Sequence, residues 1–376
     1  MLKVGILGGG QLGRMLLQAA ANYPVETSVM ENDADCPAAH LCHHFVKGDI
    51  RHYDDVYTFG KGLDALTIEI ESVNDDALAA LEAEGVKIYP RTPALRIIKN
   101  KIEQKQFYAA HSIPSANFVI TQSLRDLEQH TDFFPGVHKL ASGGYDGKGV
   151  QIIKSAQDDG KGFDAKNILE KKVNIHKEIA QIVAVNEAGQ TTLYPPVDMV
   201  FDPELNLLDY QVSPAELTET ILWKVEAIAL KVVKALASPG IFAVELFIDK
   251  VGEVFVNETA PRVHNSGHHT IEGNYSSQFD MLWRIILGYP LGNTAAILPA
   301  AIVNMLGEEN YSGVAQYDGL EDVLQMDNVF VHIYGKKETR PGRKMGHVTI
   351  LSADRKDLTY KQSRIRHVLK VVSGEK

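Results

Sequence analysis

The sequence predicts an α/β protein of two to four packed domains, with a Rossmann-like unit at its start. Its 376 residues are more than a single hydrophobic core usually organises. A buried-strand pattern at residues 4–7 leads into segment 8–13, GGGQLG, and an apolar helical run follows at 14–21. This G-x-G-x-x-G spacing between a strand and a helix is typical of a Rossmann-like unit that presents backbone N–H groups to an anion. Glu31 stands about where such a unit carries its ribose-binding acid.

Composition and charge narrow the classes of function. Hydrophobic residues make up 45% of the chain and charged residues 23%, as in ordinary globular proteins. No apolar run approaches the ~20 residues of a membrane span, and the first residues lack the pattern of a signal peptide. We therefore expect a cytoplasmic protein without a membrane partner. The net charge of −10 argues against nucleic-acid binding, because that affinity comes from lysine and arginine.

The two cysteines, Cys36 and Cys42, lie close to His40, His43 and His44 in the sequence. This set would allow a zinc site, but structural zinc sites usually carry Cys-x₂₋₄-Cys pairs. We expect two reduced thiols instead.

Further patterns predict elements along the chain. The run 65–73 predicts a strand whose alternation places Glu69 and Glu71 on one side. Thr92 and Pro93 predict the start of a helix that continues toward residue 108, with a basic face at 99–105. The capping-box pattern SPAE at 213–216 predicts the start of a helix through residue 232. The remaining predicted elements are a helix at 277–287 and strands at 299–306 and 329–334.

Two alternating apolar runs flank a turn at 250–253 and predict a β-hairpin. With this loop, Phe247 pairs with Val256, and Glu245 pairs with Glu258 on one face. Carboxylates that lie opposite each other repel unless a cation compensates them. Mg²⁺ accepts one or two carboxylates and completes its octahedron with water and phosphate oxygens, so the pair suits a metal–nucleotide site. Two solvated glutamates on an outer face are the alternative.

Segment 257–268 (NETAPRVHNSGH), which begins in the second arm of the hairpin, resembles the metal-and-bicarbonate segment of the N5-carboxyaminoimidazole ribonucleotide synthetases, ATP-grasp enzymes of purine biosynthesis. Two more segments resemble this family and follow its order: the glycine-rich 143–150 (GGYDGKGV) and the basic 340–347 (RPGRKMGH). The resemblance implies an α/β ATP-grasp fold. Its expected parts are an N-terminal Rossmann-like (pre-ATP-grasp) domain at 1–98, a nucleotide clamp at 99–300 with a mobile flap lobe at about 116–173, and a small C-terminal β-rich domain at 301–376.

The resemblance also implies an activity, the ATP- and bicarbonate-dependent carboxylation of 5-aminoimidazole ribonucleotide to its N5-carboxy product via carboxyphosphate. ATP and Mg²⁺, or Mn²⁺ in its place, are the expected cofactors, and a homodimer is the expected assembly. One alternative is another ATP-grasp ligase of purine biosynthesis, the formate-dependent phosphoribosylglycinamide formyltransferase. Others are an NAD-dependent dehydrogenase that uses segment 8–13 and a nucleotide-binding module without catalysis.

The same resemblance implies residues for the metal and for ATP. Glu245 and Glu258 would bind the metal, Glu170 the adenine side of ATP, and Glu178 the ribose hydroxyls. A basic residue of the helix at 92–108 would approach the phosphates, and the spacing leaves Arg96 and Lys99 open, as well as a merely solvated charged face. The full set expected to contact ATP is Lys139, Gly144, Gly147, Glu170, Glu178 and Asn257.

Catalytic and substrate-binding residues follow from the resemblance in the same way. Arg262 would hold bicarbonate, since its planar fork matches that anion. His264, with Asp146, would handle the proton of the amine, and Tyr145 and Lys148 would face bicarbonate and the aminoimidazole. The basic segment 336–344 suits a phosphate, although it could serve only to protect a sheet edge. The residues expected to hold the ribonucleotide are Gly10, Gln11, Glu71, Asn265, Lys336, Arg343 and Lys344.

Overall fold

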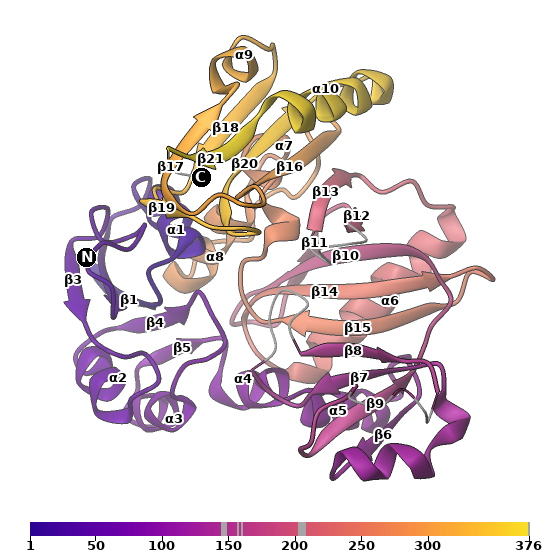
Figure 1. Ribbon diagram of the computed structural model, residues 1–376. Coiled ribbons are helices and arrows are strands. Elements are labelled where there is room, and N and C mark those ends of the chain that lie inside the picture. Colours follow the sequence, from indigo (N-terminus) through magenta and orange to yellow (C-terminus); the bar gives the residue numbers. More distant parts are fainter. Residues whose placement is uncertain (144–148, 156–157, 159–160, 202–207, 375–376) are drawn as a thin grey trace.

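A computed structural model of the chain describes residues 1–143, 149–155, 158, 161–201 and 208–374. These residues form an N-terminal unit, a central two-lobed unit and a C-terminal unit (Figure 1). The N-terminal unit contains a parallel sheet in the order β3-β2-β1-β4-β5. Its strands are β1 (Leu2–Leu7), β2 (Val25–Glu31), β3 (His44–Lys47), β4 (Ala65–Ile68) and β5 (Lys87–Tyr89), and its helices are α1 (Gln11–Ala20), α2 (Tyr53–Gly60) and α3 (Asp75–Ala83).

Alternating side chains of β1 place helices on both faces of this sheet. Val4 and Ile6 pack in the cluster that contains α1, whereas Leu7 packs with α2 and α3. The predicted Rossmann-like unit is therefore confirmed. The strand predicted at 65–73 is too long, because β4 ends at Ile68, and Glu69 and Glu71 lie in the bend that follows it.

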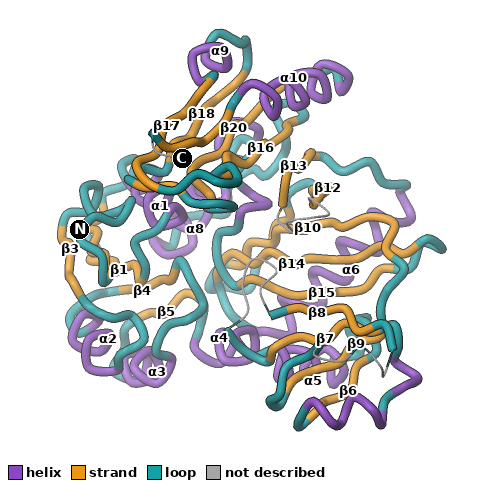
Figure 2. Tube along the Cα trace, in the orientation of Figure 1, coloured by secondary structure: helices purple, strands orange, loops and turns teal. Residues whose placement is uncertain are grey.

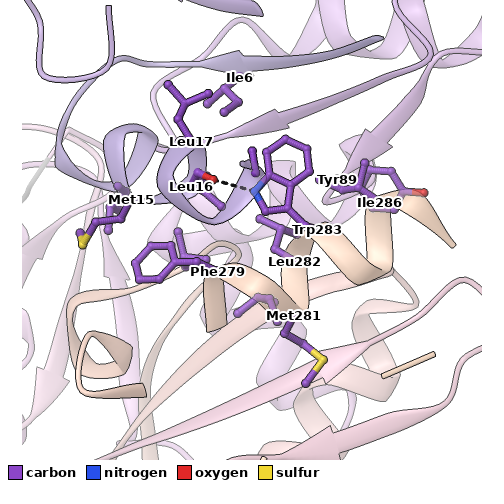
Figure 3. Packing of buried hydrophobic residues seen from close by; sticks show 14 of the residues in the cluster. Ile6, Met15, Leu16, Leu17, Tyr89, Phe279, Met281, Leu282, Trp283 and Ile286 are labelled. Atoms are coloured by element: carbon purple, nitrogen blue, oxygen red, sulfur yellow. Dashed lines mark hydrogen bonds between the residues drawn. The ribbon is translucent and has the colours of Figure 1, made fainter. Parts of the chain in front are cut away.

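The N-terminal unit packs on α8 (Gln278–Leu287) of the central unit. Trp283 is fully buried against α1, and its Nε1 donates to the backbone oxygen of Leu16 (2.7 Å; Figure 3). Phe279 and Leu282 fill the same cluster. A helix from the middle of the chain thus completes the core of the first domain.

The helix predicted from residue 92 to 108 is interrupted. It forms α4 (Thr92–Lys99) and α5 (Lys101–Ala110), and Asn100 between them caps α5 by accepting from the N–H of Ile102 (2.9 Å). The flap lobe follows as an antiparallel sheet in the order β6-β9-β7-β8. Its strands are β6 (Phe118–Thr121), β7 (Gly136–Leu140), β8 (Val150–Ile153) and β9 (Asn167–Lys171), with two 3-10 turns, η1 (Leu124–Gln129) and η2 (Thr131–Phe133), between β6 and β7.

The large sheet follows the order β15-β14-β10-β12-β13-β16-β20-β18, with β11 beside β10. Helix α6 (Glu219–Leu236) covers one face of β14 and β15 through Val225 and Val232 (Figure 2). The capping box predicted at residue 213 is wrong, since Ser213 ends β13 and Thr218 caps α6. The central strands are β10 (Ile175–Val185), β11 (Thr191–Leu193), β12 (Val197–Phe201), β13 (Leu208–Ser213), β14 (Gly240–Asp249) and β15 (Val254–Ala260).

The C-terminal unit continues this sheet, because β13 pairs with β16. Its core lies between the sheet and α10 and includes Val348, Leu358 and Ile365. Among the described helices, none is long and apolar enough to cross a membrane. The remaining elements are η3 (Asn265–Gly267), α7 (Thr270–Gly273), β16 (Ala300–Leu306), β17 (Gly313–Asp318), α9 (Leu320–Leu324), β18 (Val329–Ile333), β19 (Glu338–Thr339), β20 (Lys344–Leu351), α10 (Arg355–Val368) and β21 (Lys370–Ser373).

Candidate active site

The hairpin of β14 and β15 brings two carboxylates face to face. Glu245 pairs directly with Glu258, as predicted. Nearer the turn the predicted pairing of Phe247 with Val256 is wrong, because Phe247 pairs with Phe255. A β-bulge in β15 lies between these pairs and cancels the one-residue shift. The acids therefore meet although the register at the turn differs from the prediction.

The charges around this pair are unbalanced. Burial, followed by the charges of Glu258 and Glu178, raises the pKa of Glu245. The ammonium group of Lys101, the first residue of α5, forms an ion pair with Glu258 and holds the pKa of that carboxyl below its usual range. Burial raises the pKa of Glu178, on neighbouring β10, to about 7. Two carboxyls, those of Glu258 and Glu178, and one ammonium group, that of Lys101, thus act on Glu245, an arrangement that favours binding of a cation.

The donor set fits a hard divalent cation whose other ligands come from a substrate. Within the described ranges, no group of three or more His, Cys, Asp or Glu could hold a metal by itself. Two facing carboxylates match Mg²⁺ when phosphate oxygens and water complete the octahedron. Cys36 and Cys42 are free thiols, and burial raises the pKa of both. Their reduced state stays a prediction.

A buried triad of charges lies at the base of the flap lobe. Oε2 of Glu170 (β9) is 2.9 Å from Nζ of Lys139 (β7), and its Oε1 is 3.3 Å from Nζ of Lys105 (α5). Burial alone would raise the pKa of Glu170, but Lys139 and then Lys105 lower it overall. The Lys139 ammonium also donates to Oδ1 of Asn257, the extra residue of the bulge (2.9 Å). The triad has an excess positive charge beside the carboxylate pair, as a phosphate site requires.

The basic residues of α4 do not reach this site. Arg96 pairs with Asp75 and Asp76, and Lys99 contacts Asp75 and the backbone oxygen of Val73. The cations that the helical segment directs into the site are Lys101 and Lys105 of α5. The break at residue 100 explains this, because it turns the following helix toward the flap lobe, where the N–H of Lys101 donates to the oxygen of Ala141 (2.7 Å).

Arg262 joins the central unit to the N-terminal unit. Its Nε lies 2.9 Å from Oε1 of Glu71, and its Nη2 donates to Oε2 of Glu71 (3.1 Å). The predicted bicarbonate residue and a predicted ribonucleotide residue therefore lie side by side. His264 is next along the loop, with Nε2 3.6 Å from Oε1 of Glu245 and Nδ1 3.0 Å from Oγ of Ser266.

Asn265 follows in the same loop, and both polar atoms of its amide are buried and lack a partner among the described residues. Buried polar atoms are normally satisfied, so this amide suits a ligand contact. Its backbone oxygen is held separately, by Nε2 of Gln211 on β13 (3.0 Å). The loop from 262 to 265 thus carries three polar side chains, and that of His264 lies beside the carboxylate pair.

The glycine loop at 8–13 is occupied by side chains of the protein itself. The N–H groups of Gly10 and Gly13 donate to Glu69, each at 2.7 Å, and the N–H of Gly9 donates to Glu31 (3.1 Å). These are the groups that would face the pyrophosphate of a dinucleotide. The structure thus disfavours the dehydrogenase alternative, and the contact of Gly10 with the substrate stays a prediction. Gln11, half-buried, begins α1 beside this loop.

The basic segment of the C-terminal unit lies against the N-terminal unit. Lys337 pairs with Asp35 (2.8 Å), and a Cβ at Gly335 would lie 3.6 Å from Nη1 of Arg14. Lys336 donates to the backbone oxygen of Lys344 (2.7 Å), and Arg343 donates to the oxygen of Glu338 (2.8 Å). The C-terminal and N-terminal units are therefore in contact at this basic segment. Five predicted site residues lie outside the described part of the chain: Gly144, Tyr145, Asp146, Gly147 and Lys148.

Comparisons with known proteins identify this arrangement. Three family models match in order: the ribonucleotide synthetase preATP-grasp domain at 1–99, the ATP-grasp domain at 106–279, and the phosphoribosylaminoimidazole carboxylase C-terminal domain at 300–361. The N5-carboxyaminoimidazole ribonucleotide synthase of Aquifex aeolicus is 33% identical over 377 residues, with 98% of each chain covered. The chain belongs to the N5-carboxyaminoimidazole ribonucleotide synthetase family.

Other members of this family agree in sequence and structure. The crystal structure of the Thermotoga maritima synthetase is 38% identical and has a TM-score of 0.91, covering 99% of this chain and 100% of that one. The Aspergillus clavatus synthase in complex with ADP and 5-aminoimidazole ribonucleotide is 29% identical, with a TM-score of 0.88 and 97% and 98% coverage. The chloroplastic phosphoribosylaminoimidazole carboxylase of Vigna aconitifolia is 38% identical over 368 residues, and the chain spans 64% of its length.

The predicted ATP-grasp fold and family are thus confirmed, and the chain is an ATP-dependent ligase of purine biosynthesis. Its reaction as a synthetase of this family is the carboxylation of 5-aminoimidazole ribonucleotide to the N5-carboxy product. The sequence interpretation missed Lys101 and Lys105 as cations of the site. It also missed Glu69 as the partner of the glycine loop. The sequence shows a basic run at 99–105. The break at Asn100 separates Lys99, which lies away from the site, from Lys101 and Lys105, which point into it.

Proposed function

We propose that the described carboxylates and lysines hold Mg-ATP so that its γ-phosphate faces bicarbonate beside Arg262. Glu245 and Glu258 would bind Mg²⁺, or Mn²⁺, which supplies charge neutralisation at the transferring phosphoryl group when bound. Lys101, Lys105 and Lys139 would contact the phosphates. The single observation that carries the proposal is the direct pairing of the two glutamates across the hairpin.

Nucleotide recognition follows from the neighbouring strands. Glu178 would accept hydrogen bonds from the ribose hydroxyls as a carboxylate, and Glu170 would orient the two buried lysines at the adenine side. Asn257 holds Lys139 in place from the bulge. Gly144, Gly147, Tyr145 and Lys148 stay predictions for the flap that covers the phosphates and bicarbonate.

The proposed chemistry has two group transfers. A bicarbonate oxygen attacks the γ-phosphorus, the bond to ADP breaks, and carboxyphosphate and ADP form. The exocyclic amine of the ribonucleotide then attacks the carboxyl carbon, or carbon dioxide released from it in place, and inorganic phosphate leaves. Arg262 holds the bicarbonate oxygens in its planar fork while Glu71 fixes the orientation of that fork. His264 receives the amine proton, with Asp146 as its predicted partner.

The ribonucleotide would lie between the two ends of the chain. Its phosphate would contact Lys336, Arg343 and Lys344, and its ribose would lie near Gln11 and the glycine loop. The amide of Asn265 would contact the aminoimidazole, because its polar atoms are buried without a partner among the described residues. The homodimer, the cytoplasmic location and the domain limits at 98 and 300 remain proposals. Size-exclusion chromatography with light scattering tests the first of them.

One assay tests the function. Phosphate release from Mg-ATP is measured with 5-aminoimidazole ribonucleotide, in the presence and absence of bicarbonate. We expect release that depends on both the ribonucleotide and bicarbonate, with one N5-carboxy product formed per phosphate. Release that requires formate instead, or release that ignores the ribonucleotide, would contradict the proposal.

A further inference from the structure

The amide of Gln278 holds both backbone groups of His264. Gln278 is the first residue of α8 and is fully buried. Its Oε1 accepts a hydrogen bond from the backbone N–H of His264 (2.9 Å), and its Nε2 donates to the backbone oxygen of His264 (2.7 Å). One side chain therefore supplies the pair of bonds that a neighbouring strand would supply.

The loop is shaped to receive this amide. A Cβ atom at Gly267 would lie 2.4 Å from Oε1 of Gln278, so a larger residue would displace the amide. Thr270 connects the two segments, since its Oγ1 accepts from the N–H of Gln278 (2.9 Å) and donates to the oxygen of Gly267 (2.6 Å). Loop and amide thus fit each other closely.

Gln278 belongs to a helix that is packed in a core, whereas the loop that carries His264 is not part of a sheet. β15 ends at Ala260, and η3 is the one regular element described between residues 261 and 268. Helix α8, by contrast, buries Phe279 and Trp283 in the core that it shares with α1 (Figure 3). Gln278 therefore transmits the position of a packed helix to the loop.

We propose that Gln278 is a positioning residue for the carboxylation, which fixes the backbone of His264 so that its imidazole meets the reacting amine. The inference rests on the role proposed above for His264. An amide suits this task because one side chain must accept from an N–H and donate to a carbonyl oxygen at the same time. Methionine can do neither, and an ionised glutamate can only accept.

The first test compares two buried glutamines. We expect Gln278→Met to lower kcat roughly 10- to 100-fold, because a small misplacement of a reacting group costs about that much, and to leave KM for ATP little changed. Gln181→Met is the matched control, since Gln181 is also fully buried and donates to a backbone oxygen, that of Tyr194 (2.6 Å). We expect both variants to lose stability. If Gln181→Met lowers kcat equally, the effect is general destabilisation and the proposal is wrong.

The second test uses Gln278→Glu, in which lowering the pH protonates the new carboxyl and so restores a hydrogen-bond donor to the backbone oxygen of His264. In Gln278→Glu, the protonated carboxyl can donate to the oxygen of His264 and accept from its N–H, whereas the carboxylate cannot donate. We expect the ratio of variant to parent kcat to rise as the pH falls, because the ratio removes any pH dependence that the two proteins share. Nδ1 of His268 lies 3.5 Å from Nε2 of Gln278, but burial holds the pKa of His268 well below its usual value, so it stays neutral. A ratio independent of pH would overturn the proposal.

Two further variants separate the inference from the proposed function. Gly267→Ala should displace the amide and reproduce the kcat loss of Gln278→Met, and a parent-like kcat would count against the proposal. If His264→Asn lowers kcat while Gln278→Met does not, the positioning role fails and the proposed function stands. If His264→Asn keeps the parent kcat, the role of His264 fails and the inference fails with it.

Discussion

Replacing Lys105 by methionine should separate the stability of the protein from its affinity for ATP. The Lys105 side chain is only 2% exposed, and its Nζ lies 3.3 Å from Oε1 of Glu170, its one oppositely charged ion-pair partner among the described residues. Glu170 is shared with Lys139, which lies closer at 2.9 Å. Burial lowers the pKa of Lys105 by more than the attraction of Glu170 raises it. The positive charge of Lys105 is therefore not needed to neutralise Glu170 in the unliganded protein.

The expected magnitudes follow from this geometry. Methionine fills the space of the lysine stem and leaves the Lys139–Glu170 pair intact. Removing one partner of a buried ion pair typically costs about 3–5 kcal/mol, because it leaves an uncompensated buried charge. Here Lys139 still compensates Glu170, so the free energy of unfolding should stay nearly constant or rise. One lost charge-assisted contact to phosphate costs about 1.5–3 kcal/mol, which raises KM for ATP roughly 10- to 100-fold.

The assay combines thermal or urea unfolding without nucleotide with steady-state kinetics in ATP. Lys99→Met is the control, because Lys99 contacts Asp75 and the oxygen of Val73 and should leave KM for ATP unchanged. A Lys105→Met protein that loses more than about 2 kcal/mol of stability and keeps its KM for ATP would refute the reasoning. Lys105 would then be a structural cation.

Three shorter predictions concern the rest of the site. Glu258→Gln should reduce phosphate release at least about 100-fold with an unchanged circular dichroism spectrum, and near-normal Mg²⁺-dependent release would show that the metal assignment is wrong. Arg343→Ala should raise KM for the ribonucleotide and not KM for ATP, whereas equal effects on both would count against a substrate-phosphate contact. Because the pKa of Glu178 is raised to about 7, its carboxylate is lost as the pH falls through that value, so KM for ATP should rise below about pH 7. Glu178→Gln should remove this dependence, and a parent KM that stays constant from about pH 8 to 6 would contradict the role in ribose binding.

Local pattern and motif order were sufficient to predict the fold. The alternation in β1 and the glycine loop predicted the Rossmann-like unit, and the order of three motifs predicted the ATP-grasp clamp. The failures lie where a local signal meets a long-range constraint. Asn100 interrupts one predicted helix, and Ser213 continues a strand of the large sheet although its sequence resembles a helix cap. Such positions depend on what packs against them, which the local sequence does not specify.

The site was predictable in its acids and less so in its cations. The predicted register near the turn is wrong by one residue, and a β-bulge restores the predicted pairing at Glu245 and Glu258. Strand periodicity cannot locate a bulge. The triad of Lys105, Lys139 and Glu170 joins α5, β7 and β9, so no spacing along the chain reveals it. These three side chains come together only when the flap lobe folds against α5.

The central claim is that the two facing glutamates of the hairpin share one divalent ion with the nucleotide. Anomalous diffraction from crystals grown with Mn²⁺ and a non-hydrolysable ATP analogue tests it most directly. We predict one strong peak within coordination distance of a carboxylate oxygen of both Glu245 and Glu258 and of the analogue's phosphates. A peak bound by the phosphates alone, with both carboxylates turned away, would contradict the account.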